Sequence, residues 1–236
     1  MKRMDIQALL DFDKNLLLWF NGSESIFMDN LMIVLTSGLT WIPLYLSLLY
    51  IIVKNNDTMP QILLVVGCSL LCVCLADGMA DLIVKPWVMR PRPSNDPILK
   101  YSISVVDNMR GSGYSFFSAH AANTFSLALF FSLLIRSKVL GVTLVLWSLV
   151  NCYTRMYLGL HYPSDILAGL AWGAVSGIIS YTIYVFVYNK FKFKKKYISS
   201  KYTSTGFDNN DIDIPMLVIC MTFIYSIFWS IIKNVG

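Results

Sequence analysis

Residues 164–188 read SDILAGLAWGAVSGIISYTIYVFVY, and Asp165 is their single charged residue. About 20 mostly apolar residues are enough for an α-helix to cross the hydrocarbon core of a bilayer. Backbone polar groups meet no water in that core, so a crossing segment has to satisfy them within a helix. We therefore expect residues 164–188 to form a transmembrane helix that begins near Asp165.

Five other apolar runs flank this helix. The complete set of expected spans is 31–53, 60–84, 118–136, 138–157, 164–188 and 214–232. Composition agrees, because 56% of the residues are hydrophobic and 14% are charged, against about 25% charged in soluble domains. The sequence predicts an all-α fold, a polytopic membrane helix bundle of about six transmembrane helices. It forms one domain over 1–236, with a motif-bearing core at about 31–188 and an extra C-terminal span at about 214–232.

Two further patterns concern how the helices lie. Residues 1–20 mix apolar and charged positions, which is typical of a helix lying in the membrane interface rather than of a cleavable signal peptide. Gly169, Gly173 and Gly177 follow one another at four-residue spacing within the span 164–188. Small residues on one helix face let a second helix approach closely. We expect these glycines to serve packing and not chemistry.

The distribution of basic residues predicts the orientation. Six consecutive spans place alternate loops on opposite sides of the membrane. One side carries Lys54, Arg136, Lys138 and six lysines between Lys190 and Lys201, nine basic residues in short loops, which favours the cytoplasm. The opposite side is also basic, and the assignment holds if several of its cations bind substrate. It predicts a protein of the cytoplasmic (inner) membrane with a site facing the periplasm or exterior.

The cysteines and the net charge exclude several kinds of site. All five cysteines lie in apolar runs without histidines at the spacing of a zinc site, so we expect free thiols that pack as small hydrophobic side chains. The net charge of +5 resides in loops and not on a soluble basic face, which argues against nucleic acid as a partner. The sequence predicts no metal, no cofactor and no disulfide.

Chemistry concentrates at one predicted end of the bundle. His120 and His161, the two histidines of the chain, lie at span ends on the same predicted side, together with Lys85, Arg92 and Arg155. Cations are costly at membrane depth and usually functional there. The planar guanidinium of arginine also matches the oxygens of a phosphate group. This combination indicates a phosphate-binding site.

Three local motifs sharpen that expectation. They are KPWVMRPRP at 85–93, FSAH at 117–120 and TRMYLGLHYPSD at 154–165. In order and spacing they resemble the three signature motifs of the type-2 phosphatidic acid phosphatase family, K-x6-RP, PSGH and SR-x5-H-x3-D. Any one of these motifs is weak, but three in order on one side of a membrane protein are very specific.

The chain departs from the family pattern in two places. Phe117 and Ala119 replace the proline and glycine of the second motif, and Thr154 replaces the serine of the third. Alanine restricts the backbone more than glycine does, which can alter how the chain near Ser118 approaches phosphate. No charged or titrating residue is lost, so an active enzyme is still expected.

The resemblance implies a catalytic mechanism. His161 would attack phosphorus and form a phosphohistidine, Asp165 would orient the His161 ring, and His120 would protonate the leaving oxygen. A second group would bind the phosphoryl oxygens: Lys85, Arg92, Ser118, Ala119 and Arg155. Its three cations can take the place of the magnesium that many phosphoryl-transfer enzymes use.

Two residues are candidates for supporting roles behind the site. Asp81 stands four residues before Lys85, a spacing at which an acid and a base pair on one helix face. It could position Lys85, or both Asp77 and Asp81 could lie near the water boundary or hydrogen-bond neighbouring helices, and the sequence favours neither reading. Arg90 could aid phosphate binding, support the site from behind or face the lipid headgroups.

The resemblance implies an integral membrane lipid phosphatase acting on a phosphomonoester or a diphosphate, because helices flanking the site let a lipid enter sideways. We rank undecaprenyl diphosphate first, since residues 1–20 are similar to the N-terminal segment of small bacterial undecaprenyl-diphosphate phosphatases, and lipid A second. A non-catalytic lipid-phosphate binding or transport protein is the alternative from another class, although a binder needs no pair such as His120 and His161. Vanadate-dependent haloperoxidases share similar motifs, but they are soluble.

Overall fold

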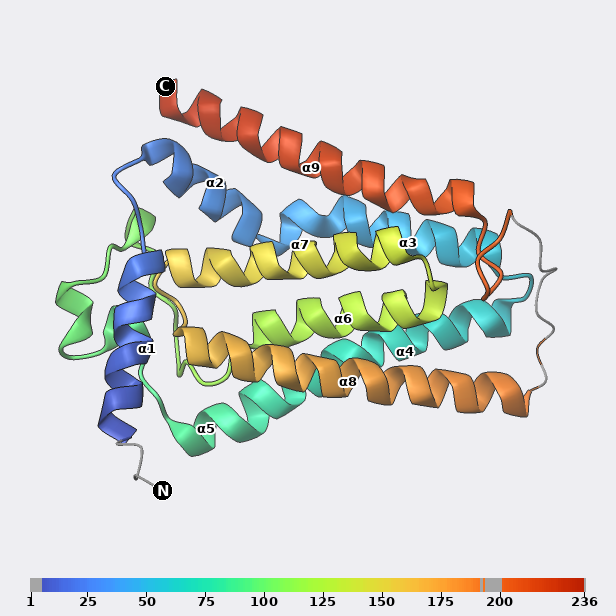
Figure 1. Ribbon diagram of the computed structural model, residues 1–236, viewed down its shortest axis with the longest axis horizontal. Helices are drawn as coiled ribbons and strands as arrows, with labels where there is room; N and C mark the ends of the chain where they lie inside the picture. Colours follow the sequence, from blue (N-terminus) through green and yellow to red (C-terminus); the bar gives the residue numbers. More distant parts are fainter. Residues whose placement is uncertain (1–5, 192, 194–200, 236) are drawn as a thin grey trace.

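The computed structural model describes residues 6–191, 193 and 201–235. In this part of the chain the regular elements are helical, apart from an isolated β-bridge between Tyr202 and Asp208. The α-helices are α1 (Ile6–Phe20), α2 (Ile26–Thr36), α3 (Ile42–Asn55), α4 (Met59–Asp77), α5 (Lys85–Val88), α6 (Ala119–Ile135), α7 (Lys138–Tyr157), α8 (Pro163–Lys190) and α9 (Asn209–Val235). Figure 1 shows most of them aligned along one axis, with α1 lying across one end. The predicted all-α bundle is confirmed.

Five helical segments are long and apolar enough to cross a membrane, and α2 and α6 are shorter apolar helices. The five begin at Gly38, Met59, Lys138, Pro163 and Asn209. α6 has 17 residues, at the short end of the range of about 17–25 for a membrane span. It lies inside the bundle, in contact with α4, α7 and α8. The expected span 118–136 is therefore present as a short apolar helix inside the bundle.

The expected span 31–53 is wrong as a single helix. α2 ends at Thr36, a 3₁₀ turn follows, and α3 starts at Ile42 with Pro43 in its first turn. Proline is tolerated there because the first-turn amides lack an intrahelical partner, whereas in a continuous helix it would remove a hydrogen bond. The apolar run hides this break, because the turn residues are themselves mostly apolar or small.

The expected span 60–84 continues beyond its predicted end. α4 passes into a π-helical segment, Gly78–Val84, and then into α5, which ends at Val88. π-Helical turns are rare and are often found at functional sites. Lys85 therefore lies near the end of the continuous helical segment formed by α4, the π-helical turns and α5, and not in a loop.

The glycine face of α8 packs against α6, as predicted. A Cβ atom added at any of the three glycines would lie 2.6–2.8 Å from a backbone carbonyl oxygen of α6, far inside van der Waals contact. The facing pairs are Gly169 with Ser118, Gly173 with Ala122, and Gly177 with Ser126. This close packing brings the start of α6 next to the start of α8, where the motif residues stand.

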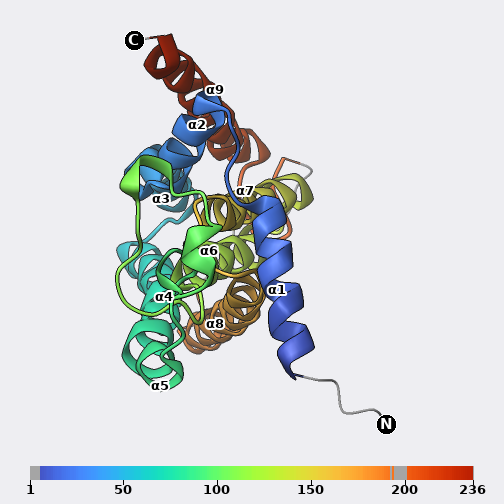
Figure 2. The same ribbon diagram turned by 90° about the vertical axis from the view of Figure 1, so that its left-hand side faces the viewer.

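The two ends of the bundle carry different connections. Figure 1 places the α5–α6 loop, the α7–α8 turn, the start of α1 and the end of α9 at one end, and the α3–α4 and α6–α7 turns at the other. This agrees with the predicted alternation of loops. α1 crosses the first end in contact with α7 and α8 (Figure 2), and Phe12 and Trp19 on it are exposed, as befits an interfacial helix. Most of the predicted lysine run falls on 192 and 194–200, outside the described residues.

The expectations for cysteines and metal sites concern the same bundle. All five cysteines are free thiols in the structure. Across 6–191, 193 and 201–235, no three or more His, Cys, Asp or Glu side chains gather as they would around a metal ion.

Candidate active site

The turn between α7 and α8 brings His161 and Asp165 together. α8 begins at Pro163, where the missing amide of proline costs nothing. Asp165, the third residue of α8, accepts a hydrogen bond from the Tyr162 amide at 3.0 Å. The same carboxylate oxygen lies 3.5 Å from Nδ1 of His161, and both side chains are buried. The predicted carboxylate–histidine pair is thus present, at ion-pair distance.

The surroundings of His161 keep its ring neutral. Burial lowers the pKa of His161 to about 4 from its usual 6.5; nearby Asp165 opposes this shift, and the charges of Arg92 and Arg155 add to it. A neutral imidazole retains one nitrogen lone pair. With Nδ1 directed at Asp165, Nε2 is the nitrogen available to attack phosphorus.

Arg92 reaches this nitrogen from the loop after α5. Its Nη1 lies 3.2 Å from Nε2 of His161 and donates to the Leu160 carbonyl at 3.1 Å, while its Nε donates to the Ser112 carbonyl at 2.9 Å. A Cβ atom at Gly111 would lie 2.5 Å from Cδ of Arg92. The loop backbone at Gly111 therefore packs directly against the Arg92 side chain and restricts its conformation.

Arg155 and His120 converge on one residue of α2. Arg155 lies in the last turn of α7, and its Nη1 donates to Oγ1 of Thr36 at 2.8 Å. The ring of His120, in the first turn of α6, lies beside the backbone of the same Thr36. Nε of Arg155 is buried and has no hydrogen-bond partner in the described part of the chain.

Arg92 and Arg155 share an electrostatic feature. Neither forms an ion pair within the ranges that the structure describes, and the hydrogen bonds given above lead to carbonyls, a hydroxyl and a ring. A buried charge is costly unless it is paired. Two such guanidinium groups beside a neutral His161 form a place where a phosphate dianion would supply the missing negative charge.

The start of α6 contributes its backbone to this region. Ser118 is the N-cap residue: its hydroxyl accepts from the Ala121 amide at 3.4 Å, and its own amide donates to the Asp165 carbonyl at 3.1 Å. The predicted phosphate ligand Ser118 is thus engaged in capping and fully buried. Ala119 is the first residue of α6, at the positive end of the helix dipole, where anions bind favourably.

Lys85 stands apart from the other cations. Its ammonium group pairs with Asp81 one turn earlier on the same helical segment, which favours the positioning role considered for Asp81. Among the described residues, no hydrogen bond or ion pair joins Lys85 to His161, Arg92 or Arg155. The structure therefore brings Arg92, Arg155, His120, His161 and Asp165 together and leaves Lys85 at the side.

Arg90 lies behind Asp165 in a paired network. Its Nη1 donates to Oδ1 of Asp165 at 2.8 Å and to Ser164 at 2.7 Å, while its Nη2 donates to Asp13 at 2.7 Å. The guanidinium also lies 3.7 Å from the centre of the Tyr162 ring. The contacts of Arg90 are those of a residue that supports Asp165 from behind.

Asp13 and Thr36 are the two site residues that the sequence did not reveal. Asp13 of α1 accepts from the Ser164 amide at 2.9 Å and pairs with Arg90. It stands between Leu9 and Leu17 on one helix face, and an acid inside an apolar stripe was a usable signal. Thr36 carried no such signal, because a threonine in an apolar run is ordinary.

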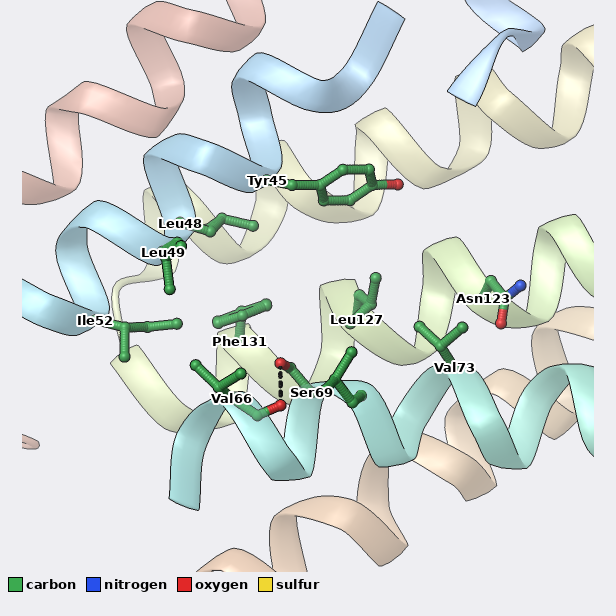
Figure 3. Close-up of a pocket in the computed structure, with 11 residues that line it drawn as sticks. Tyr45, Leu48, Leu49, Ile52, Val66, Ser69, Val73, Asn123, Leu127 and Phe131 are labelled. Carbon is green, nitrogen blue, oxygen red and sulfur yellow. Dashed lines mark hydrogen bonds between the residues drawn. The ribbon is translucent and has the colours of Figure 1, made fainter. Parts of the chain in front are cut away.

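An apolar groove runs along the bundle beside the site. It has a volume of about 390 Å³ and is lined by α3, α4 and α6 (Figure 3), a size in the usual range for ligand pockets. Ser69 contributes a hydroxyl that donates back to Val66 at 2.8 Å. Tyr45 and Asn123 stand at one end of the groove (Figure 3), and Asn123 lies one helical turn from His120 on α6. The groove thus reaches from the apolar bundle toward the site.

Comparisons with known proteins agree with this arrangement. The model of the PAP2 superfamily matches residues 61–190. The lipid A 4'-phosphatase of Bacteroides thetaiotaomicron is 43% identical over 180 residues, 75% of this chain and 79% of the relative. That of Porphyromonas gingivalis is 32% identical over 183 residues, 77% of this chain and 76% of the relative.

A more distant similarity points the same way. The phosphatidylglycerophosphatase B of Haemophilus influenzae is 36% identical over 95 residues, 36% of this chain and 37% of the relative. No solved structure matches the chain. The family model covers more than half of the sequence and includes every motif residue, and the chain therefore belongs to the PAP2 superfamily of membrane lipid phosphatases.

Proposed function

We propose that this protein removes the 4'-phosphate of lipid A. The observation that carries the phosphatase chemistry is a pair of arginines beside neutral His161, Arg92 buried and Arg155 partly buried, that have no acidic partner among the described residues. The choice of lipid rests on two relatives, both lipid A 4'-phosphatases, that match about three quarters of the chain. These relatives favour lipid A over undecaprenyl diphosphate, which the sequence ranked first.

The proposed reaction has two steps. Nε2 of His161 attacks phosphorus, the bond from phosphorus to the lipid oxygen breaks, and His120 gives that oxygen its proton. Water then attacks the phosphohistidine with His120 accepting its proton, which releases inorganic phosphate and free His161. Arg92 and Arg155 stabilise the negative charge on the transferred group in both steps, and Asp165 stabilises the ring that becomes cationic.

A lipid fits the surroundings better than a water-soluble ester. The apolar groove between α3, α4 and α6 offers a place for part of one acyl chain while the headgroup lies at the end of the bundle. The predicted topology places that end at the outer face of the cytoplasmic membrane, where a lipid can enter sideways between helices.

Phosphate release from purified protein in detergent tests the proposal. The panel contains lipid A, undecaprenyl diphosphate, phosphatidylglycerophosphate and phosphatidic acid, all with EDTA present, and His161→Gln is the matched inactive variant. Release from lipid A that EDTA leaves intact and His161→Gln abolishes is the expected result. Preference for another lipid would overturn the substrate, magnesium-dependent release would overturn metal independence, and binding of lipid A without turnover would favour the non-catalytic alternative.

A further inference from the structure

The end of α2 lies inside the bundle, and its last carbonyl groups need partners from elsewhere. The hydroxyl of Thr40 donates to the Val34 carbonyl at 2.6 Å, and the indole of Trp41 donates to the Leu35 carbonyl at 2.8 Å. The backbone of Thr36, the next residue, lies beside the ring of His120 instead. The turn that breaks the expected span 31–53 therefore caps the carbonyl groups of Val34 and Leu35 at the end of α2. The backbone of Thr36 is left to face the site.

The side chain of Thr36 faces the same site. Its Oγ1 accepts from Nη1 of Arg155 at 2.8 Å and also lies 3.1 Å from the hydroxyl of Thr154. Thr36 is 7% exposed, so water does not readily replace it as the partner of Arg155. One residue thus contacts the proposed acid and one of the two unpaired arginines.

We propose that Thr36 is a positioning residue for phosphoryl transfer: its backbone directs His120 and its hydroxyl directs Arg155 toward the phosphorus bound at His161. This rests on the proposed phosphatase chemistry but not on the choice of lipid. α2 lies outside residues 61–190, which the family model matches. The positioning role therefore belongs to a helix beyond the shared core.

The chemistry explains why such a residue is needed. Arg155 has no acidic partner among the described residues, so nothing else of opposite charge holds its flexible side chain. Stabilisation of a transition state depends on donors that are in place before the charge develops. Without the Thr36 hydroxyl, Arg155 can turn away between turnovers. Catalysis should then suffer more than substrate binding, since lipid binding draws mainly on other contacts.

Three variants test this role, with turnover measured on the panel lipid that the wild type hydrolyses fastest. Thr36→Val keeps the shape and removes the hydroxyl, Thr36→Ser keeps the hydroxyl, and Thr40→Val removes a capping hydroxyl from the same turn without touching the site. We expect Thr36→Val to lower kcat by about 10- to 100-fold with KM changed less than about threefold. Thr36→Ser and Thr40→Val should stay within about threefold of wild type in kcat.

Vanadate, a phosphate mimic that can adopt the geometry of the transition state, provides a second measurement. Its affinity for Thr36→Val should fall at least about tenfold, and its affinity for Thr40→Val should not change. Thr36→Ala replaces Thr36→Val if the valine variant does not fold.

Two results would overturn the role of Thr36: wild-type kcat and vanadate affinity in Thr36→Val, or an equal loss in Thr40→Val, which would indicate only a weakened turn. Failure of the wild type on every panel lipid would refute the proposed function instead, and vanadate affinity alone would then decide the role of Thr36.

Discussion

Arg90 and Arg155 lie at the same end of the bundle, yet their electrostatic surroundings are opposite. Arg90 bonds to two carboxylates, Asp13 and Asp165. Arg155 is held by the hydroxyl of Thr36, and Arg92 by carbonyl groups and a histidine ring. An arginine whose charge is already matched can support structure. One whose charge is unmatched in a buried place raises the free energy of the empty protein until an anion arrives.

Acidic partners therefore distinguish an arginine that supports the structure from one that can bind phosphate, without reference to any relative. Among the described residues, Arg90 has two acidic partners, whereas Arg92 and Arg155 have none. This difference favours Arg92 and Arg155 as the phosphate ligands that the sequence predicts, and Arg90 as a support for Asp165.

The largest effect should follow from removing an unpaired arginine. Arg155→Ala and Arg92→Ala should each lower kcat/KM by about 10²- to 10³-fold, the usual loss for one transition-state donor. Their thermal stability should change little, because no ion pair is broken. Arg110→Ala is the matched control, since Arg110 lies in the neighbouring loop and, among the described residues, donates a hydrogen bond to the Ser94 carbonyl at 2.7 Å. An equal loss of kcat/KM in Arg110→Ala would contradict a special role for the arginines that lack an acidic partner.

Removing the paired arginine should act mainly on stability. Arg90→Ala leaves Asp13 and Asp165 without their shared cation, and we expect a loss of about 3 kcal/mol in the free energy of unfolding, seen as a lower Tm in detergent. Its kcat/KM should fall about tenfold, because Asp165 loses one of its supports. If the double variant Asp13→Ala, Arg90→Ala loses as much as the two single variants added together, the two residues do not act as a pair.

The groove gives a prediction that depends on lipid chain length. Val73→Trp places a bulky ring in the groove and should raise KM for a long-chain lipid phosphate about tenfold, while a short-chain analogue is affected less than about threefold. Cys74→Trp is the control, because Cys74 follows on the same helix, is exposed and does not line the groove. Equal effects on long and short chains would show that the chain lies elsewhere.

A further effect on stability concerns pH. His161 has a pKa of about 4 when folded and 6.5 when unrestrained, so between these values the unfolded chain binds more protons. Stability should therefore fall as the pH drops from about 6.5 towards 4, by up to about 1.4 kcal/mol per pH unit. His161→Gln cannot titrate and should lose less Tm over this window. A loss equal to that of the wild type would mean that His161 is not kept neutral by burial.

Local patterns in the sequence predicted most of the helices and the core of the site. The step from His161 to Asp165 is a four-residue spacing with Pro163 between, so their meeting follows from one turn of helix. Thr36 meets Arg155 across 119 positions of the chain, and Asp13 meets Ser164 across 151. Such contacts depend on how helices pack, which hydropathy does not encode. The break after Thr36 was not predicted, because the turn residues that follow it are mostly apolar or small and do not interrupt the apolar run.

His161, flanked by unmatched cations, is proposed to take the phosphoryl group from a lipid. The most direct test is to mix the protein with lipid A labelled at its 4'-phosphate, stop the reaction with alkali, which preserves phosphohistidine, and map the label by peptide. Label is expected on the peptide that contains His161, and no label is expected in His161→Gln. Phosphate release without labelled protein at any time, or label on His120, would contradict it.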